Sequence, residues 1–123
     1  MLFRSQTGKN SDKNNTPNTF DVLLTAHQAD DTIETLLMNF FKGTGMRGLK
    51  GIPVKRGRVV RPLLFALREN IVIYATENNI SFRHDASNDK DYYTRNYFRM
   101  HVIPAIEKVF PAVKQNLLAN IHR

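Results

Sequence analysis

Four residues with chemically useful side chains lie within eight positions of one another, and they are His27, Asp30, Asp31 and Glu34. If a helix begins near Asp30, spacings of three and four residues bring the three carboxylates together. Such a cluster can hold a cation, because carboxylate oxygens pair directly with an ammonium group and are hard ligands for Mg²⁺. The same spacing also fits an ordinary helix start, where the helix dipole favours acids and Asp31 with Glu34 forms a capping box.

A strand and a helix are predicted around this cluster, and they determine where it would lie. Residues 22–26 form a short apolar, β-branched run that is typical of a buried strand. The residues after it have the apolar spacing of a helix, which Gly43 is expected to end. The apolar stripe consists of Ile33, Leu36, Leu37, Phe40 and Phe41. His27 and the carboxylates would therefore lie at the carboxyl edge of a sheet, where α/β proteins bind ligands.

Weaker patterns indicate the remaining elements. In chain order we expect a glycine-rich loop over 43–51, a basic turn with Lys55, Arg56 and Arg58, a strand over 59–61, a helix over 67–78, a brief strand over 80–82, a polar loop over 85–91 and a helix over 92–101. Pro104 and Pro111 mark kinks or helix starts in an apolar C-terminal part. Residues 1–19 are polar and lack periodicity, which predicts a disordered or non-native tail.

The composition limits the class of protein. Lys and Arg number 18 against 11 Asp and Glu, and the net charge of +7 favours a polyanionic partner such as RNA or an acidic membrane surface. No apolar run approaches the roughly 20 residues of a membrane span, and no signal-like segment is seen, so we expect a cytoplasmic protein that does not enter a membrane. The absence of cysteine excludes disulfides, thiolate metal sites and cysteine nucleophiles.

The stretch from Thr25 to Thr35, Thr-Ala-His-Gln-Ala-Asp-Asp-Thr-Ile-Glu-Thr, resembles a motif of the tRNA(Ile)-lysidine synthetases. In that motif a strand ending in Ala-His-His is followed by x-Asp-Asp-x-x-Glu-Thr. The resemblance runs from about Phe20 to the C-terminus, in the family's order and spacing. Its further pieces are residues 42–52, 60–64, 85–88 and 94–96, with Arg99 and Pro104.

The resemblance implies an α/β fold, namely a partial PP-loop domain of the adenine nucleotide alpha hydrolase-like, Rossmann-like type with a helical C-terminal part. Residues 20–66 would form the C-terminal half of the nucleotide domain. Residues 67–123 would continue the catalytic region as helices. The resemblance also allows a homodimer of the full-length protein.

The activity implied by the resemblance is an ATP-dependent ligation. The enzyme adenylates C2 of the wobble cytidine in tRNA(Ile) with a CAU anticodon, releasing diphosphate, and the ε-amine of free L-lysine then displaces AMP. Carried over to this chain, Asp31 and Glu34 would recognise lysine. His27 and Asp30 would shape the catalytic site on its nucleotide and metal side, with Asp30 as the ligand of Mg²⁺.

The same resemblance assigns contacts with phosphate and with RNA. Arg47 and Arg61, with His27, would face the nucleotide or phosphate. Arg95, Asn96 and Arg99 would contact tRNA, a role that fits arginines at a helix start.

The sequence departs from the family pattern in two ways. The Ser-Gly-Gly-x-Asp-Ser signature, whose backbone amides would grip the ATP phosphates, does not occur in the chain, and Gln28 stands where a second histidine is common. We therefore expect the middle part of a synthetase, inactive alone. The strand over 22–26 would then have an unpaired edge and the chain marginal stability.

Two other classes of function compete with this interpretation. Another PP-loop tRNA-modifying enzyme is one, although members that use catalytic cysteines are disfavoured by the absence of cysteine. A non-catalytic, basic RNA-binding fragment is the other, because it would need the charged surface but not the missing signature.

Overall fold

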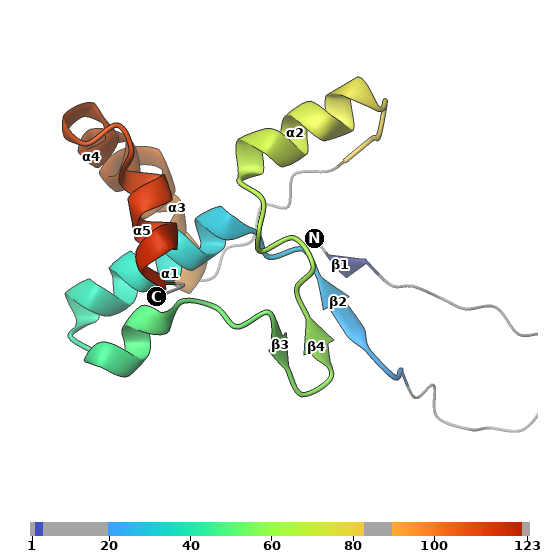
Figure 1. The fold of residues 1–123 in the computed structure, drawn as a ribbon, viewed down its shortest axis with the longest axis horizontal. Coiled ribbons are helices and arrows are strands. Elements are labelled where there is room, and N and C mark those ends of the chain that lie inside the picture. The colour runs from blue at the N-terminus through green and yellow to red at the C-terminus, as the bar shows by residue number, and fades with distance from the viewer. Residues whose placement is uncertain (1, 4–19, 83–89, 122–123) are drawn as a thin grey trace, which may run out of the picture.

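Four short strands form one mixed sheet in this computed structural model, which describes residues 2–3, 20–82 and 90–121 (Figure 1). The strands are β1 (Leu2–Phe3), β2 (Leu23–Thr25), β3 (Lys55–Arg56) and β4 (Val59–Val60). Their order is β1-β2-β4-β3, and only the central pair β2–β4 is parallel. Because parallel strands end on the same side of a sheet, the residues that follow β2 and β4 are brought together there.

The first strand corrects two expectations. β1 pairs with β2 on the side away from β4, so the unpaired edge predicted for residues 22–26 is wrong. Leu2 and Phe3 belong to a strand although the sequence predicts a tail over residues 1–19. The physical reason is that an extended apolar dipeptide supplies the backbone N–H and C=O groups that the edge of β2 needs. Residues 4–19 lie outside the described part of the chain.

The predicted turn from strand to helix is confirmed. α1 (Ala29–Lys42) is separated from β2 by three residues and is followed by Gly43, whose φ of 70° lies in the left-handed region. Asp31 accepts a hydrogen bond from the N–H of Gln28, the residue before the helix, at 2.8 Å. Asp31 therefore caps the helix, but its partner is Gln28 and not Glu34, because the helix begins at Ala29.

The remaining elements agree in part with the sequence patterns. They are η1 (Met46–Lys50), a short 3-10 helix, α2 (Arg68–Glu77), α3 (Lys90–Tyr97), η2 (Phe98–Val102), a π-helical segment, α4 (Ile103–Val109) and α5 (Val113–Ile121). The predicted helix over 67–78 is confirmed as α2. Residues 43–51 contain η1 where a loop is expected, and residues 80–82 form no strand. Residues 85–88 lie outside the described ranges.

Pro104 shapes the long C-terminal helical stretch. α3, η2 and α4 follow one another without a break, so the helix predicted over 92–101 extends to Val109. Pro104 lies in the first turn of α4. Proline has no N–H and cannot bond to the carbonyl of Met100, and the wider π turn covers the residues before it. The predicted kink or helix start therefore takes the form of a π-helical segment.

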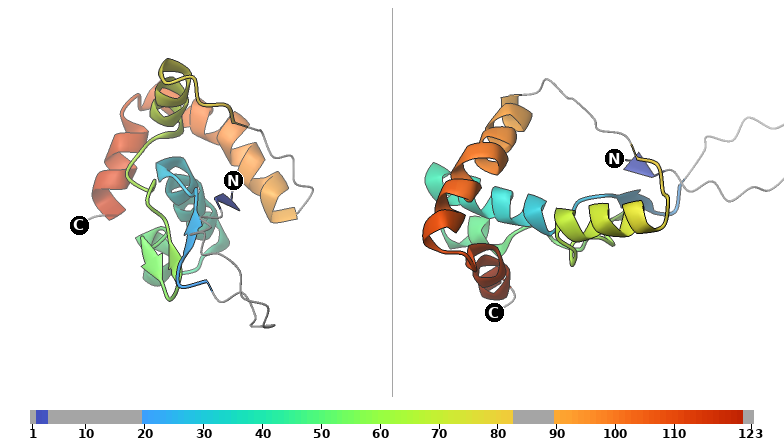
Figure 2. Two further views of the ribbon diagram at one scale, coloured as in Figure 1. Left: turned by 90° about the vertical axis from the view of Figure 1, so that its right-hand side faces the viewer. Right: turned by 90° about the horizontal axis from the view of Figure 1, so that it is seen from above.

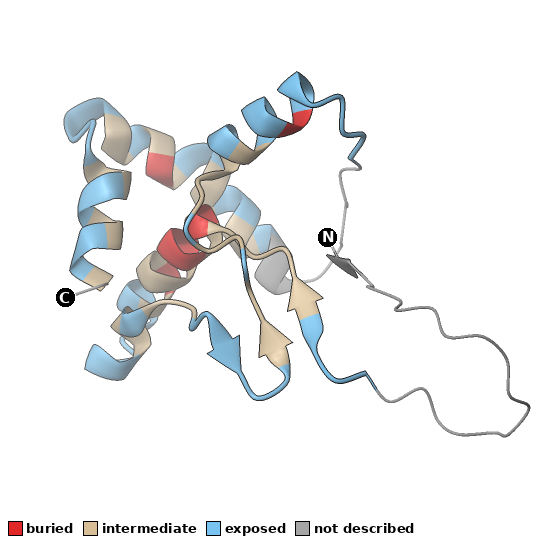
Figure 3. Ribbon diagram, turned by 45° about the vertical axis from the view of Figure 1, so that its right-hand side comes forward, coloured by how far each residue is buried: buried red, intermediate tan, exposed pale blue. Residues whose placement is uncertain are grey.

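The core is centred on the N-terminal half of α1. Figure 3 shows the buried positions concentrated there, and α1 contacts η1, α3 and α5. Its fully buried side chains include Ile33 and Glu34, one apolar and one charged. α2 stands apart from the C-terminal helices (Figure 2). No helix in the described part of the chain is long and apolar enough to cross a membrane.

A substitution at Gly51 tests how closely the residues at the end of η1 pack against α1. Its φ is 71°, and a Cβ there would lie 2.6 Å from Thr32 Cγ2. We expect Gly51→Ala to lower the free energy of unfolding by about 2–3 kcal/mol, because backbone strain and steric overlap add. Gly43→Ala has the same strain but no atom within 4 Å, and should lower it by about 1 kcal/mol. Urea unfolding measures both values, and equal losses would contradict the packing.

Candidate functional site

The candidate site lies where β2, β4 and the start of α1 meet. His27 follows β2 by two residues, and its Nδ1 lies 2.8 Å from Thr25 Oγ1. The N–H of Ala29 donates to the carbonyl of Ala66 at 2.9 Å, which fixes the helix start to the segment after β4. Arg61 is the first residue after β4, so the parallel pairing brings it to the same edge as His27.

Two carboxylates of the predicted cluster bind one guanidinium. Arg99 Nε donates to Glu34 Oε1 at 2.6 Å and Arg99 Nη2 donates to Glu34 Oε2 at 3.0 Å, which makes a bidentate pair. Nη2 also donates to Asp31 Oδ1 at 3.3 Å. The side chain of Glu34 is 0% exposed, whereas those of Arg99 and Asp31 are 27% and 19% exposed. The predicted cation-binding pair thus holds a cation of this chain.

Burial dominates the titration of this ion pair. Loss of hydration raises the pKa of Glu34 above its usual range, and the hydrogen bonds from Arg99 offset that rise only in part. Burial acts to lower the pKa of Arg99, but Glu34 and Asp31 outweigh it and raise the pKa of the guanidinium. Arg99 is therefore a permanent cation, and its removal would leave a buried carboxyl group without a partner.

Asp30, the predicted metal ligand, forms a hydrogen bond and an ion pair with other residues of the chain. Its Oδ2 accepts the backbone N–H of Arg68 at 2.7 Å, and its Oδ1 lies 3.5 Å from Lys114 Nζ. Burial acts to lower the pKa of Lys114, but Asp30 and Glu107 outweigh it and raise that pKa. Among the described residues, no three His, Asp or Glu side chains are grouped to hold a metal. To bind a magnesium ion, Asp30 would have to give up one of these partners.

His27 lies among groups of both signs. Partial burial lowers the pKa of its imidazole below the usual 6.5, Asp31 acts to raise it, and Arg61 and Arg95 act to lower it. The imidazole is therefore neutral near pH 7. Arg61 Nη1 donates to the carbonyl of Pro53 at 2.9 Å, while its buried Nε has no hydrogen-bond partner among the described residues. A buried donor without a partner suits a ligand oxygen.

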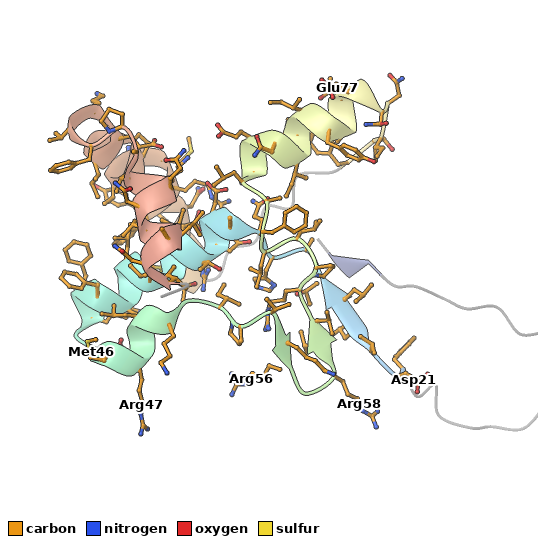
Figure 4. The ribbon with its side chains drawn as sticks, in the orientation of Figure 1. Asp21, Met46, Arg47, Arg56, Arg58 and Glu77 are labelled. Carbon is orange, nitrogen blue, oxygen red and sulfur yellow. The ribbon has the colours of Figure 1, made fainter. Side chains whose placement is uncertain are left out.

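The other predicted site residues are dispersed. Arg47 is exposed on η1 and points away from the rest of the chain (Figure 4). Arg95 lies near enough to His27 to influence its pKa, and Asn96 is exposed on α3. Arg99 is engaged by the carboxylates of α1. The structure therefore brings Arg95 and Arg99 to the site, but not Arg47.

Sequence reasoning missed three groups that complete the site. Thr25 lies two residues before His27 on an extended segment, and the period of two that places both on one face would have predicted their contact. Lys114 and the backbone N–H of Arg68 reach Asp30 from distant parts of the chain. No local pattern indicates such contacts.

Comparison with known proteins defines the class. A profile of the PP-loop domain family matches residues 11–106, which is most of the chain. The chain therefore belongs to the PP-loop domain family. The expected α/β fold with a partly helical C-terminal region is confirmed by this match and by the arrangement of the elements.

The relatives within that class confirm the resemblance to lysidine synthetases. The chain is 47% identical over 97 residues to the tRNA(Ile)-lysidine synthase of Bacillus subtilis (strain 168), with 76% of this chain and 21% of the relative covered. Over 92 residues it is 40% identical to the enzyme of the same name from Parabacteroides distasonis, with 75% and 21% covered. For Chlorobaculum tepidum the identity is 44% over 88 residues, with 72% and 27% covered. The chain thus spans 21–27% of the length of these relatives.

The ion pair between α1 and η2 should be a main source of stability. We expect Arg99→Met to lower the free energy of unfolding by about 3–5 kcal/mol, because it leaves Glu34 buried without a partner. The double variant Arg99→Met/Glu34→Met should lose less than the sum of the single losses. Lys114→Met, at a longer and more exposed pair, should lose less than Arg99→Met. Additive losses in urea unfolding would show that the two side chains are not coupled.

The charges around His27 should be visible in its titration. In an NMR titration we expect a midpoint below 6.5. Arg95→Gln should raise the midpoint and Asp31→Asn should lower it, since one removes a cation and the other an anion. Because the folded pKa is depressed, His27 contributes stability above pH 6.5 that is lost as the pH falls through the folded pKa. A midpoint at or above 6.5 would contradict the burial of the ring.

Proposed function

We propose that this chain forms the lysine-accepting part of a tRNA(Ile)-lysidine synthetase, which joins lysine to C2 of the wobble cytidine of tRNA(Ile) with a CAU anticodon. The observation that carries the proposal is the carboxylate pair Asp31 and Glu34, which holds a guanidinium at the start of α1. A site that stabilises one half-buried cation suits the ammonium group of lysine. The relatives named tRNA(Ile)-lysidine synthase support the same substrates.

The proposed reaction has two steps. O2 of the cytidine attacks the α-phosphate of ATP, and diphosphate leaves. The bound ε-ammonium group of lysine first gives up a proton, and the resulting neutral amine attacks C2; the C2–O bond breaks, and AMP leaves with that oxygen. The amine nitrogen must lose a proton, and His27 is the proposed acceptor, because burial lowers its pKa and a neutral imidazole accepts a proton near pH 7.

Arg99 sets how lysine would enter. Both oxygens of Glu34 accept hydrogen bonds from Arg99, and of the two carboxylates only Asp31 has any exposure. The ammonium group would therefore meet Asp31 first and would reach Glu34 by sharing or displacing Nη2 of Arg99. Asp31 and Glu34 are thus both proposed as lysine ligands, and Asp31 is the more accessible of the two.

The phosphate and tRNA contacts rest on separate observations. Arg61, with His27, is proposed to face phosphate oxygens, and its unpartnered buried Nε supports this role. Arg47 is supported by its charge and exposure alone. Arg95 and Asn96 are proposed to contact tRNA at the start of the C-terminal helical stretch, in the cytoplasm where tRNA and free lysine are found.

One alternative function is favoured by a specific observation. The net charge of +7, together with a sequence that lacks Ser-Gly-Gly-x-Asp-Ser, fits a basic RNA-binding segment without chemistry of its own. Another PP-loop tRNA-modifying enzyme would belong to the same family, but that function does not explain why the site has a cation-binding carboxylate pair. ATP binding by the 123 residues alone has no signature loop to support it, so we predict that they are inactive by themselves.

A chimera tests the lysine site. Residues 20–123 replace the homologous segment of the Bacillus subtilis relative, and ATP-dependent incorporation of labelled lysine into tRNA(Ile) is measured. We expect an active chimera in which Asp31→Asn and Glu34→Gln each lower incorporation at least about hundredfold, because each removes charge from a desolvated cation site.

The matched control is Glu77→Gln, which neutralises an exposed carboxylate at the far end of α2 (Figure 4). Incorporation should not change in this variant. Full incorporation in Asp31→Asn and Glu34→Gln would remove the lysine-site assignment. A folded chimera that binds tRNA but never incorporates lysine would favour the RNA-binding alternative.

A further inference from the structure

The excess of positive charge in the chain comes from one segment. Residues 35–68 contain eight Lys and Arg and no Asp or Glu. The other 89 residues contain the remaining 10 Lys and Arg and all 11 Asp and Glu, a net charge of −1. The whole excess of +7 therefore comes from the part of the chain between the carboxylates of α1 and the first turn of α2.

The fold gathers most of these cations on one edge. We define the basic edge as Arg47, Lys50, Lys55, Arg56 and Arg58, all of which are exposed. The first two belong to η1 and the others to the hairpin of β3 and β4. Figure 4 shows Arg47, Arg56 and Arg58 directed outward on the same side of the molecule, away from α2 and the C-terminal helices.

The cations of this edge are not neutralised within the described part of the chain. None of the five forms an ion pair with a described carboxylate. Among the described hydrogen bonds, the only side-chain bond from these five residues runs from Arg58 Nη1 to the carbonyl of Phe20 at 3.3 Å. By contrast, Arg99 and Lys114, which lie outside the segment, are both paired with carboxylates. Arg99 and Lys114 are therefore paired within the protein, whereas the cations of the basic edge face solvent and can pair with a ligand.

We propose that the basic edge binds the ribose-phosphate backbone of RNA, as a surface separate from the carboxylate site. This inference rests on the proposed function, since tRNA is the RNA that such an enzyme would hold. Lysine and arginine side chains spaced along an exposed edge neutralise successive phosphates and release counterions. Contacts of this kind position the RNA without reading its sequence.

An acidic membrane is the other polyanion that such an edge could bind. Proteins that lie on membranes usually present cations along an amphipathic helix whose opposite face enters the lipid. Here the cations lie on a five-residue 3-10 helix and a hairpin of two-residue strands, neither of which offers such a face. The local structure therefore favours RNA.

Binding of a labelled tRNA(Ile) transcript to the 123-residue chain tests the proposal, with fluorescence anisotropy measured from about 50 to about 200 mM KCl. The variant K50E/K55E/R56E reverses three exposed charges that make no described ion pair. We expect its affinity to fall at least about tenfold and its plot of log affinity against log salt to be shallower by about two to three units.

A pair of single variants separates a site from net charge. R56E and K108E make the same change, but Lys108 lies exposed on α4, away from the basic edge (Figure 1). We expect R56E to weaken binding severalfold and K108E to leave it within about twofold. Equal losses in the two variants would overturn the proposal, because they would show a response to overall charge. Thermal unfolding followed by circular dichroism confirms that each variant is folded.

Three further outcomes are decisive. Sedimentation with phosphatidylserine vesicles that is lost in K50E/K55E/R56E, with no binding of tRNA, would overturn the proposal in favour of a membrane. Loss of tRNA binding in that variant while the chimera incorporates no lysine would support the basic edge and count against the synthetase function. An active chimera whose incorporation of lysine is unchanged by K50E/K55E/R56E would support the synthetase function and overturn the basic edge as an RNA-binding surface.

Discussion

The ion pair between Glu34 and Arg99 is the interaction on which the rest of the structure depends. A fully buried carboxyl group is tolerated only with a partner, and the sole described donor to both of its oxygens comes from a residue 65 positions away. The pair therefore ties the C-terminal helical stretch to α1. It also orients Asp31, which accepts from the same guanidinium while capping the helix start. The same ion pair thus joins the helices and forms part of the site.

The backbone around Arg99 is adapted to this contact. Arg99 lies in the π-helical segment that precedes Pro104. A π turn widens the helix by one residue, and such turns often occur at functional sites because they redirect a side chain. Here the proline that prevents regular α-helical bonding and the arginine that reaches α1 are five residues apart. The irregular segment before the proline therefore contains the arginine that pairs with the buried carboxylate.

Local patterns predicted β2, α1, Gly43, α2 and β4, because each is encoded by neighbouring residues: an apolar run, a helical stripe or a left-handed glycine. They also placed His27 and the carboxylates at the sheet edge. They did not predict η1, the π-helical segment or β1, since these depend on packing and on pairing with distant backbone. Arg99 was expected to face tRNA, and nothing near it in sequence indicates Glu34 as its partner. The contacts of Asp30 with Lys114 and with the N–H of Arg68 could not be predicted either, because these groups come close only in the fold; its role as a metal ligand stays a prediction.

The uneven distribution of charge gives the molecule an electrostatic direction. Residues 35–68 carry a charge of +8 and the remaining residues a charge of −1. The electrostatic potential is therefore more positive on the side of η1 and the hairpin than around the acidic helix start. Such a field orients an approaching polyanion before contact. This steering raises the association rate constant more than it lowers the dissociation rate constant. Salt would slow this approach, because screening shortens the distance over which the field acts. If RNA binds as proposed, the charge pattern determines which face of the molecule it meets first.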